Sequence, residues 1–142
     1  MLNLPRRVLL ALAAVIDIAH HARTEPVSLR AFAERNRLTP RQLEPTMQRL
    51  SRARIVVSTR GTRGGYALAR ERRRISVADI VAALGDGQDA YDGPYAGAIK
   101  AALAPAERTL DEALATVTVE DLLRAAEADF VAMSDGGGDF SI

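Results

Sequence analysis

The chain has 142 residues, of which 48% are hydrophobic and 4% aromatic, so one globular domain with an aliphatic core is expected. It has no cysteine, which excludes disulfides, thiolate zinc sites and cysteine-ligated iron–sulfur clusters. The net charge of +1 conceals a split, because residues 1–85 hold 16 arginines and 6 acidic side chains while residues 86–142 hold 3 basic and 12 acidic ones. This split indicates either a basic half that faces a polyanion such as nucleic acid or two solvated faces of a salt-bridged globule.

The first helix is expected to run roughly from Pro5 to Ala22. The residues expected on its core-facing stripe are Leu9, Leu12, Ala13, Ile16 and Ala19. Its apolar run is interrupted by Asp17, is too short to span a bilayer and lacks a small-residue cleavage signal. We therefore expect a soluble, cytoplasmic protein with no membrane partner.

Two further helices follow, each behind a residue suited to capping. The second is expected after Ser28, over about Leu29–Arg35, and the third begins at Thr39 and runs to about Ala53. Pro45 removes one backbone hydrogen bond and is expected to kink or tighten the start of the third helix. Two helices joined by a short turn, the second rich in long polar side chains, are typical of a helix-turn-helix.

A hairpin with a basic, glycine-rich tip comes next. The β-branched run Ile55–Thr59 predicts a strand, Gly61–Gly65 a turn and Tyr66–Leu68 a returning strand, with Arg60 and Arg63 at the tip. Glycines let a backbone approach phosphates closely, and arginine suits the negative potential of a narrow minor groove. The glycines alone fit a tight hairpin turn equally well. A nucleotidase phosphate loop is excluded, because the lysine-hydroxyl end is missing and a strand follows.

The C-terminal half predicts three more helices. The charge run Arg70–Arg74 precedes them and fits either a solvated linker or a phosphate contact. A helix opens at Ser76, with an apolar face made by Val77, Ile80, Val81 and Leu84. A Gly/Asp-rich stretch over Gly85–Pro94 predicts a mobile loop. Helical sequence then covers about Tyr95–Ala115, and Pro105 inside it predicts either a kink or the start of a new helix. The apolar side of this segment consists of Ile99, Leu103, Leu110 and Leu114. Thr118 and Asp121 repeat the capping pattern before a last helix over about Val119–Ala132.

The two histidines, His20 and His21, lie at the end of the first helix. They fit helix-end residues near a favourable dipole, and the alternative is a metal or redox site that would draw on Asp17. No serine-histidine-acid arrangement and no pair of carboxylates in a cleft is evident, so we expect no enzyme activity.

Five strings together resemble the Rrf2 family of bacterial regulators, which includes the iron–sulfur cluster regulator, the nitric-oxide-sensing repressor and the cysteine-metabolism repressor. The strings are Pro26–Leu29, Ala33–Arg35, Leu43–Glu44, Arg60–Ala69 and Ile75–Ile80. The wing string, Arg60-Gly61-x-x-Gly64-Gly65-Tyr66, is the most specific of them. The resemblance covers residues 1–85, weakens after Gly85 and returns faintly over 116–122.

The resemblance implies a mainly α fold with a small β-hairpin, namely a winged helix-turn-helix followed by C-terminal dimerisation helices. The implied divisions are a DNA-binding domain over 1–85, a flexible loop over 86–95, dimerisation helices over 96–133 and a disordered tail over 134–142. Cluster-bearing members place three cysteines in a region that matches about Gly85–Gly97, and this chain has none there. We therefore expect no iron–sulfur cluster, no other cofactor and no bound metal.

The resemblance also implies which residues contact DNA. Arg60 resembles the wing arginine that enters the minor groove, Arg41 and Glu44 hold base-facing positions, and Arg49 either contacts phosphate or packs. The full set of expected DNA-binding residues is Thr39, Arg41, Gln42, Glu44, Gln48, Arg49, Arg60, Thr62, Arg63 and Gly64.

The function expected from these features is sequence-specific binding of double-stranded DNA by a homodimeric repressor that recognises a palindromic operator. The alternatives are a winged-helix module that binds an acidic partner protein, and a ligand-binding protein that has lost DNA binding. The loop from Gly85 to Pro94 is the candidate site at which an unidentified effector or partner protein would act.

Overall fold

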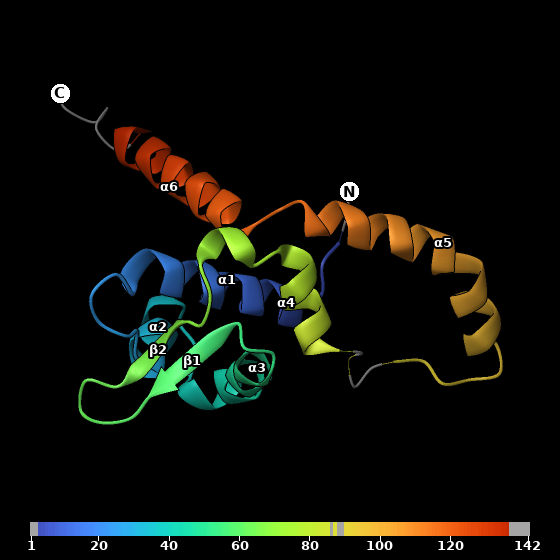
Figure 1. Cartoon of the computed structure of the whole chain (residues 1–142), viewed down its shortest axis with the longest axis horizontal. Coiled ribbons are helices and arrows are strands. Elements are labelled where there is room, and N and C mark those ends of the chain that lie inside the picture. Colours follow the sequence, from blue (N-terminus) through green and yellow to red (C-terminus); the bar gives the residue numbers. More distant parts are fainter. Residues whose placement is uncertain (1–2, 86, 88–89, 137–142) are drawn as a thin grey trace.

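The computed structural model describes residues 3–85, 87 and 90–136. The elements in chain order are α1 (Arg6–His21), α2 (Leu29–Arg35), α3 (Pro40–Arg52), β1 (Val56–Thr59), β2 (Gly65–Leu68), a 3₁₀ turn η1 (Arg72–Arg74), α4 (Val77–Leu84), α5 (Ala96–Ala115) and α6 (Val119–Gly136). Figure 1 shows α1 crossing the middle of a head built with α2, α3, α4 and the hairpin, while α5 and α6 extend away from it. No helix in the described part of the chain is long and apolar enough to cross a membrane.

The helix starts confirm the capping predictions. The Ser28 hydroxyl accepts a hydrogen bond from the Ala31 backbone N–H at 3.0 Å. At α4, Ser76 and Asp79 form a reciprocal capping box, in which each side chain accepts from the other residue's backbone N–H. These caps satisfy N–H groups that the first helical turn leaves without a partner, and they are encoded within four residues of sequence.

The ends of α2 and α3 hold a feature that the sequence did not predict. Arg37 and Arg54 adopt positive φ angles of 54° and 57°, the left-handed conformation that glycine normally supplies. After α3, the Ile55 N–H donates to the Leu50 carbonyl at 3.0 Å, which closes a Schellman motif. An L-residue in this conformation costs about 1 kcal/mol.

The core lies between α1, α3, α4 and β1. Its largest fully buried side chains are Ile18, Leu43, Met47, Leu50, Ile55, Ile75, Ile80 and Leu84. The predicted stripe of α1 was wrong at Leu9, which is 52% exposed, whereas Val8 and Val15 are buried. Because α1 is apolar on most of its surface, its sequence alone does not decide which side of the helix is buried.

The start of α6 belongs to the core of the head. Val119 and Leu123 are buried, and the Val119 N–H donates to the Ile75 carbonyl at 2.9 Å. The core of the head therefore includes residues on both sides of residue 85, and the division of the chain into domains stays a prediction. The predicted end of the last helix was short, because α6 continues to Gly136; the rest of the predicted tail lies outside the described residues.

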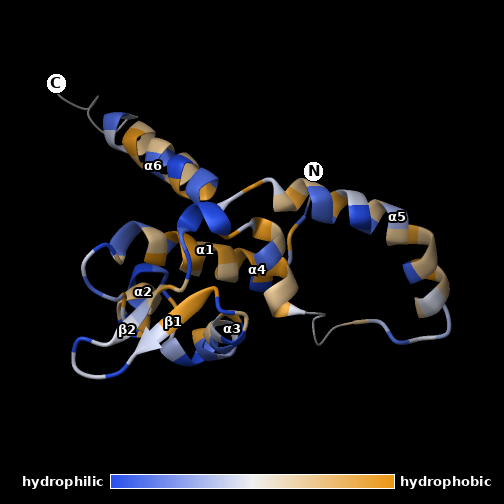
Figure 2. Ribbon diagram, viewed as in Figure 1, coloured by the Kyte–Doolittle hydropathy of each residue, from blue (hydrophilic) through white to orange (hydrophobic). Residues whose placement is uncertain are grey.

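The helix α5 is covered by very little of its own chain. It is one continuous helix through Pro105 that bends along its length in Figure 1, and none of its residues, all of which the structure describes, is buried. Ile99, Leu103 and Leu110 are 50%, 51% and 40% exposed, and Leu114 is the residue of its predicted apolar side that packs against the core. Figure 2 shows apolar turns along α5 with no other element of the chain laid against its outer side.

Candidate nucleic-acid interface

The helix α3 has one buried face and one exposed face. Leu43, Met47 and Leu50 point into the core, together with Thr46. The residues Arg41, Glu44, Pro45, Gln48 and Arg52 are exposed. Positions 41, 45, 48 and 52 follow the spacing i, i+4, i+7, i+11, so they form one stripe opposite the core. The predicted base-facing side chains thus lie on the free surface of the helix.

Pro45 does not interrupt α3, and the expected kink or tightening at the start of the helix stays a prediction. The helix runs from Pro40 to Arg52 without interruption, and Pro45 lies in its second turn with an exposed side chain. A proline in a helix interior is about 3 kcal/mol less favourable than alanine. It also leaves the Arg41 carbonyl without the backbone N–H that would normally bond to it.

Two of the residues predicted to bind DNA, Thr39 and Gln42, also cap the start of α3. The Gln42 side chain accepts from the Thr39 backbone N–H at 2.9 Å, and the Gln42 backbone N–H donates to the Thr39 hydroxyl at 3.4 Å. This capping box fixes the start of α3. Both residues are exposed, so their contact with DNA stays a prediction beside this established capping role.

Arg49 connects α3 to the end of α4. Its Nη1 donates to the Leu84 carbonyl oxygen at 2.6 Å, and Arg7 Nη1 donates to the same oxygen at 3.3 Å. The two guanidinium groups thus converge on the carboxyl end of α4, where the negative end of the helix dipole favours positive charge. We expected Arg49 either to contact phosphate or to pack within the protein, and this hydrogen bond supports packing.

The hairpin places its basic tip away from the core. Strands β1 and β2 pair in antiparallel register, from Val56 opposite Leu68 to Thr59 opposite Gly65. The tip residues Arg60, Thr62 and Arg63 are exposed. Arg63 lies 3.7 Å from the carboxylate of Glu25, at an exposed position where such a pair is weak.

The wing glycines are explained by the geometry of the hairpin. Gly61 has a φ of 116°, which disfavours other residues. A Cβ on Gly64 would overlap the Thr59 carbonyl, and a Cβ on Gly65 would overlap the Val27 backbone, to which β2 is bonded. A DNA contact by Gly64 therefore stays a prediction, since the turn alone requires glycine there.

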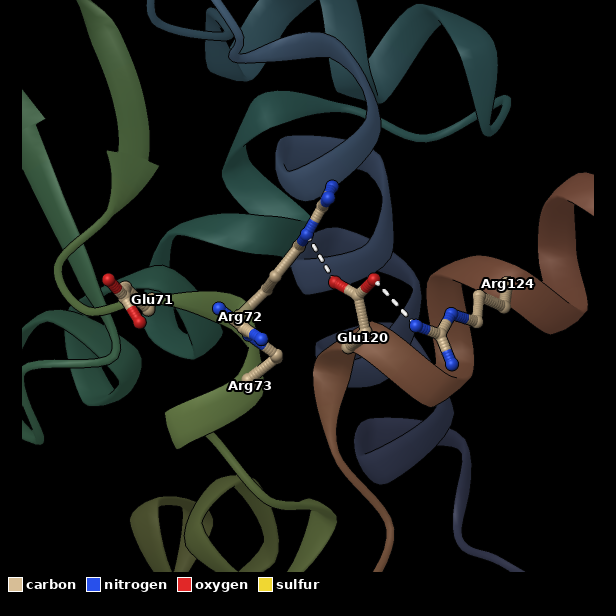
Figure 3. Close-up of a pocket in the computed structure, with 5 residues that line it drawn as sticks. All are labelled: Glu71, Arg72, Arg73, Glu120 and Arg124. Atoms are coloured by element: carbon tan, nitrogen blue, oxygen red, sulfur yellow. Dashed lines mark ion pairs between the residues drawn. The ribbon is translucent and has the colours of Figure 1, made fainter.

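The basic run before α4 makes a link that the sequence did not predict. Figure 3 shows Arg72 of η1 and Arg124 of α6 reaching Glu120 from two sides. Arg72 Nε pairs with one carboxylate oxygen of Glu120, and Arg124 Nη2 lies 3.5 Å from the other. This part of the run therefore joins the end of the wing to α6. Glu120 lies 48 residues from Arg72, so local sequence patterns gave no signal for the pair.

The two histidines pair with acidic residues of different helices. His21 Nδ1 lies 3.0 Å from the Asp17 carbonyl oxygen, and His20 Nδ1 lies 3.7 Å from Glu127 on α6. The Asp17 carboxylate in turn accepts two hydrogen bonds from Arg35, which raise the pKa of that guanidinium. This arrangement holds α1 against α2 and α6, as expected of packed residues at a helix end.

Comparison with known proteins identifies the family. The model of the Rrf2 family, described as iron-dependent transcriptional regulators, matches residues 4–125. The chain belongs to the Rrf2 family. This confirms the resemblance seen in the wing and helix strings, and it confirms that the chain falls among transcriptional regulators and not among enzymes.

Individual Rrf2 relatives support the fold over most of the chain. The structure of T. potens IscR is 34% identical and covers 90% of each chain with a TM-score of 0.72. The structure of CymR, the global cysteine regulator of B. subtilis, is 28% identical, covers 88% of this chain and 98% of that one, and gives a TM-score of 0.69. The HTH-type transcriptional regulator IscR of Xenorhabdus nematophila is 38% identical over 80 residues, or 56% of this chain. The chain spans about half the length of the curated relatives it matches. The solved structures of T. potens IscR and B. subtilis CymR confirm the winged-helix fold.

The iron implied by the description of this Rrf2 model does not fit the residues present. The sequence has no cysteine to ligate a cluster. Within residues 3–85, 87 and 90–136, no three His, Asp or Glu side chains are placed to hold a metal ion together. The candidates from the sequence do not converge, because Asp17 lies against Arg35 and His21 while His20 lies near Glu127.

Proposed function

We propose that this Rrf2 protein is a sequence-specific DNA-binding regulator that acts as a homodimer and represses transcription by occupying a palindromic operator. The observation that carries the proposal is the pairing of an exposed polar face on α3 with an exposed arginine-tipped hairpin directly after it. In Figure 1 both lie on the side of α1 away from α6. The names of the relatives support the same class of function.

Each surface of the head suits a different part of the DNA. The width of the major groove admits a helix, and side chains such as Arg41, Glu44 and Gln48 present donors and acceptors to base edges there. Arg60 at the hairpin tip suits the minor groove, whose negative potential attracts arginine. Other arginines of residues 1–85 would neutralise phosphates, apart from those such as Arg35 and Arg72 that pair with Asp17 and Glu120, so the affinity should fall steeply with salt.

The exposure of α5 supports the proposed homodimer. A helix of 20 residues with no buried side chain and three half-exposed aliphatic ones lacks the cover that stabilises most helices. A second copy related by a two-fold axis would supply that cover with the same surface. It would also set the distance between the two heads, and hence the spacing of the half-sites.

We propose that an effector or a partner protein acts on the segment between α4 and α5. A ligand or partner that binds there would shift the relative positions of the two heads. The hydrogen bond from Arg49 to Leu84 supports this idea, because it connects α3 to the residue at which the segment begins.

The proposal is tested by a gel-shift experiment with a pool of genomic fragments at two salt concentrations. We expect a subset of fragments to be retained by the dimer at both salts, with a large loss of total affinity at the higher one. A folded dimer that retains no fragment specifically at either salt would contradict the proposal. That result would favour the alternative of a module that binds an acidic protein.

A further inference from the structure

Pro45 occupies the exposed stripe of α3 without any visible structural benefit. Its side chain is not buried, so its apolar ring contributes nothing to the core. Proline is at the same time the least favourable residue for a helix interior. Residues that violate a local rule without a compensating contact are expected at functional sites, and Pro45 lies on the face that we propose enters the major groove.

The exposed neighbours of Pro45 on this stripe are polar, whereas Pro45 itself is apolar. Arg41 and Gln48 are exposed on the same stripe, one turn before and after it. Both offer polar groups to base edges, whereas Pro45 offers only the methylene groups of its ring. The ring has few conformations, so little side-chain entropy is lost when it is placed against a partner.

Among the groups that base pairs expose in the major groove, the C5-methyl of thymine is the apolar one. We infer that Pro45 is a specificity-determining residue that packs against a thymine methyl group in each half-site. The inference rests on the proposed function, and it adds a base preference that the polar residues of α3 do not explain.

The test begins with an operator selected from a random double-stranded DNA library. Each thymine is then replaced by deoxyuridine, which removes the methyl group and keeps the base pair. Burial of one methyl group corresponds to about a fourfold change in affinity, so substitution at the contacted position in both half-sites should weaken binding about 15-fold.

The same scan is repeated with Pro45→Ser, which removes the ring and restores the backbone N–H. The penalty for deoxyuridine at the contacted position should vanish in this variant, while the penalties at other positions remain. Pro105→Ser is the matched control, because Pro105 is also exposed inside a helix but lies in α5. The control should keep the wild-type pattern. Thermal unfolding of both variants separates any change in stability from the change in base preference.

A second arm separates the methyl group from other properties of an A·T pair. The contacted T·A pair is replaced by C·G, with either cytosine or 5-methylcytosine. Wild type should bind the methylated version about fourfold more tightly, and Pro45→Ser should bind both equally.

Two outcomes would overturn the inference for different reasons. If an operator is selected but the deoxyuridine penalties are the same in wild type and Pro45→Ser, the proposed function stands and the role of Pro45 is wrong. If a folded dimer selects no sequence, the proposed function fails and the inference fails with it.

Discussion

The head and α5 use similar apolar residues in opposite ways. In the head, residues such as Ile18, Leu43 and Ile80 are fully buried by other elements of the same chain. In α5, Leu103 and Leu110 stay largely exposed although their spacing also marks one helical face. The core of the head is therefore covered within a single chain, whereas the apolar side of α5 is left partly exposed and would be covered in the proposed homodimer.

The largest expected effect comes from breaking α5 while leaving the head intact. The double substitution Leu103→Asp with Leu110→Asp should convert the dimer into a monomer, because two charges cannot be buried in an apolar interface without partners. Operator affinity should then fall at least about 100-fold, through loss of bivalent binding. Light scattering and anisotropy measure both effects.

The control for that variant is Ala101→Asp, which adds a charge on the exposed opposite side of α5. It should remain dimeric and bind DNA. If the double variant also remained dimeric, another surface would have to hold the copies together.

A smaller effect is expected from the wing of the head. Arg60→Ala should weaken specific binding about tenfold, because a minor-groove arginine is lost. The control is Arg108→Ala, which removes the same charge from α5 and should leave the affinity nearly unchanged. Unchanged specific binding by Arg60→Ala would show that the hairpin is not a DNA contact.

Substitution of Arg49 tests how the head is connected to the segment that leads to α5. If the hydrogen bond to Leu84 is its main role, Arg49→Ala should lower the free energy of unfolding by about 1 kcal/mol and leave the salt dependence of binding unchanged. If Arg49 instead contacts phosphate, the stability should hold and the slope of log K against log salt should fall by about 1. Urea unfolding and anisotropy together separate the two roles.

The left-handed residue after α3 predicts a gain of stability in the head. Arg54→Gly should raise the free energy of unfolding by about 1 kcal/mol, since glycine adopts a φ of 57° without strain. Arg52→Gly, at the last residue of α3, should lower it by less than about 1 kcal/mol. Equal destabilisation by both variants in thermal unfolding would contradict the observed geometry.

The smallest effect concerns the start of α6. Hydrogen bonds from the Thr118 backbone and hydroxyl, assisted by the charge of Arg124, lower the pKa of Asp121. This carboxylate therefore stabilises the fold above its unfolded-state pKa of about 4, and the stabilisation is lost as the pH falls through the lower folded-state value. Asp121→Asn should reduce the melting temperature slightly at neutral pH, and its difference from wild type should shrink below pH 4.

The features predicted best were those encoded locally. The caps at Ser28, Thr39 and Ser76 depend on residues three or four positions apart, so they were visible in the sequence. The glycines of the wing were equally informative, because close backbone approaches between Gly64 or Gly65 and their neighbours leave no room for a side chain.

The features that were missed depend on distant parts of the chain. The burial of Val119 in the head and the pairing of Arg72 with Glu120 join segments that sequence periodicity treats as separate. The phase of α1 was misjudged at Leu9 because other elements decide which side of an apolar helix is covered. The exposed outer stripe of α3, including Arg52, could have been found from its spacing of eleven residues after Arg41.

We propose that two heads are joined through α5 to read DNA. The decisive experiment is selection from a random double-stranded library, with the wild-type protein and the Leu103→Asp, Leu110→Asp variant in parallel. Wild type should enrich two inverted half-sites at one fixed spacing, and the variant should enrich at most a single half-site. Enrichment of the same inverted pair by both proteins, or of no sequence by a folded wild-type dimer, would contradict it.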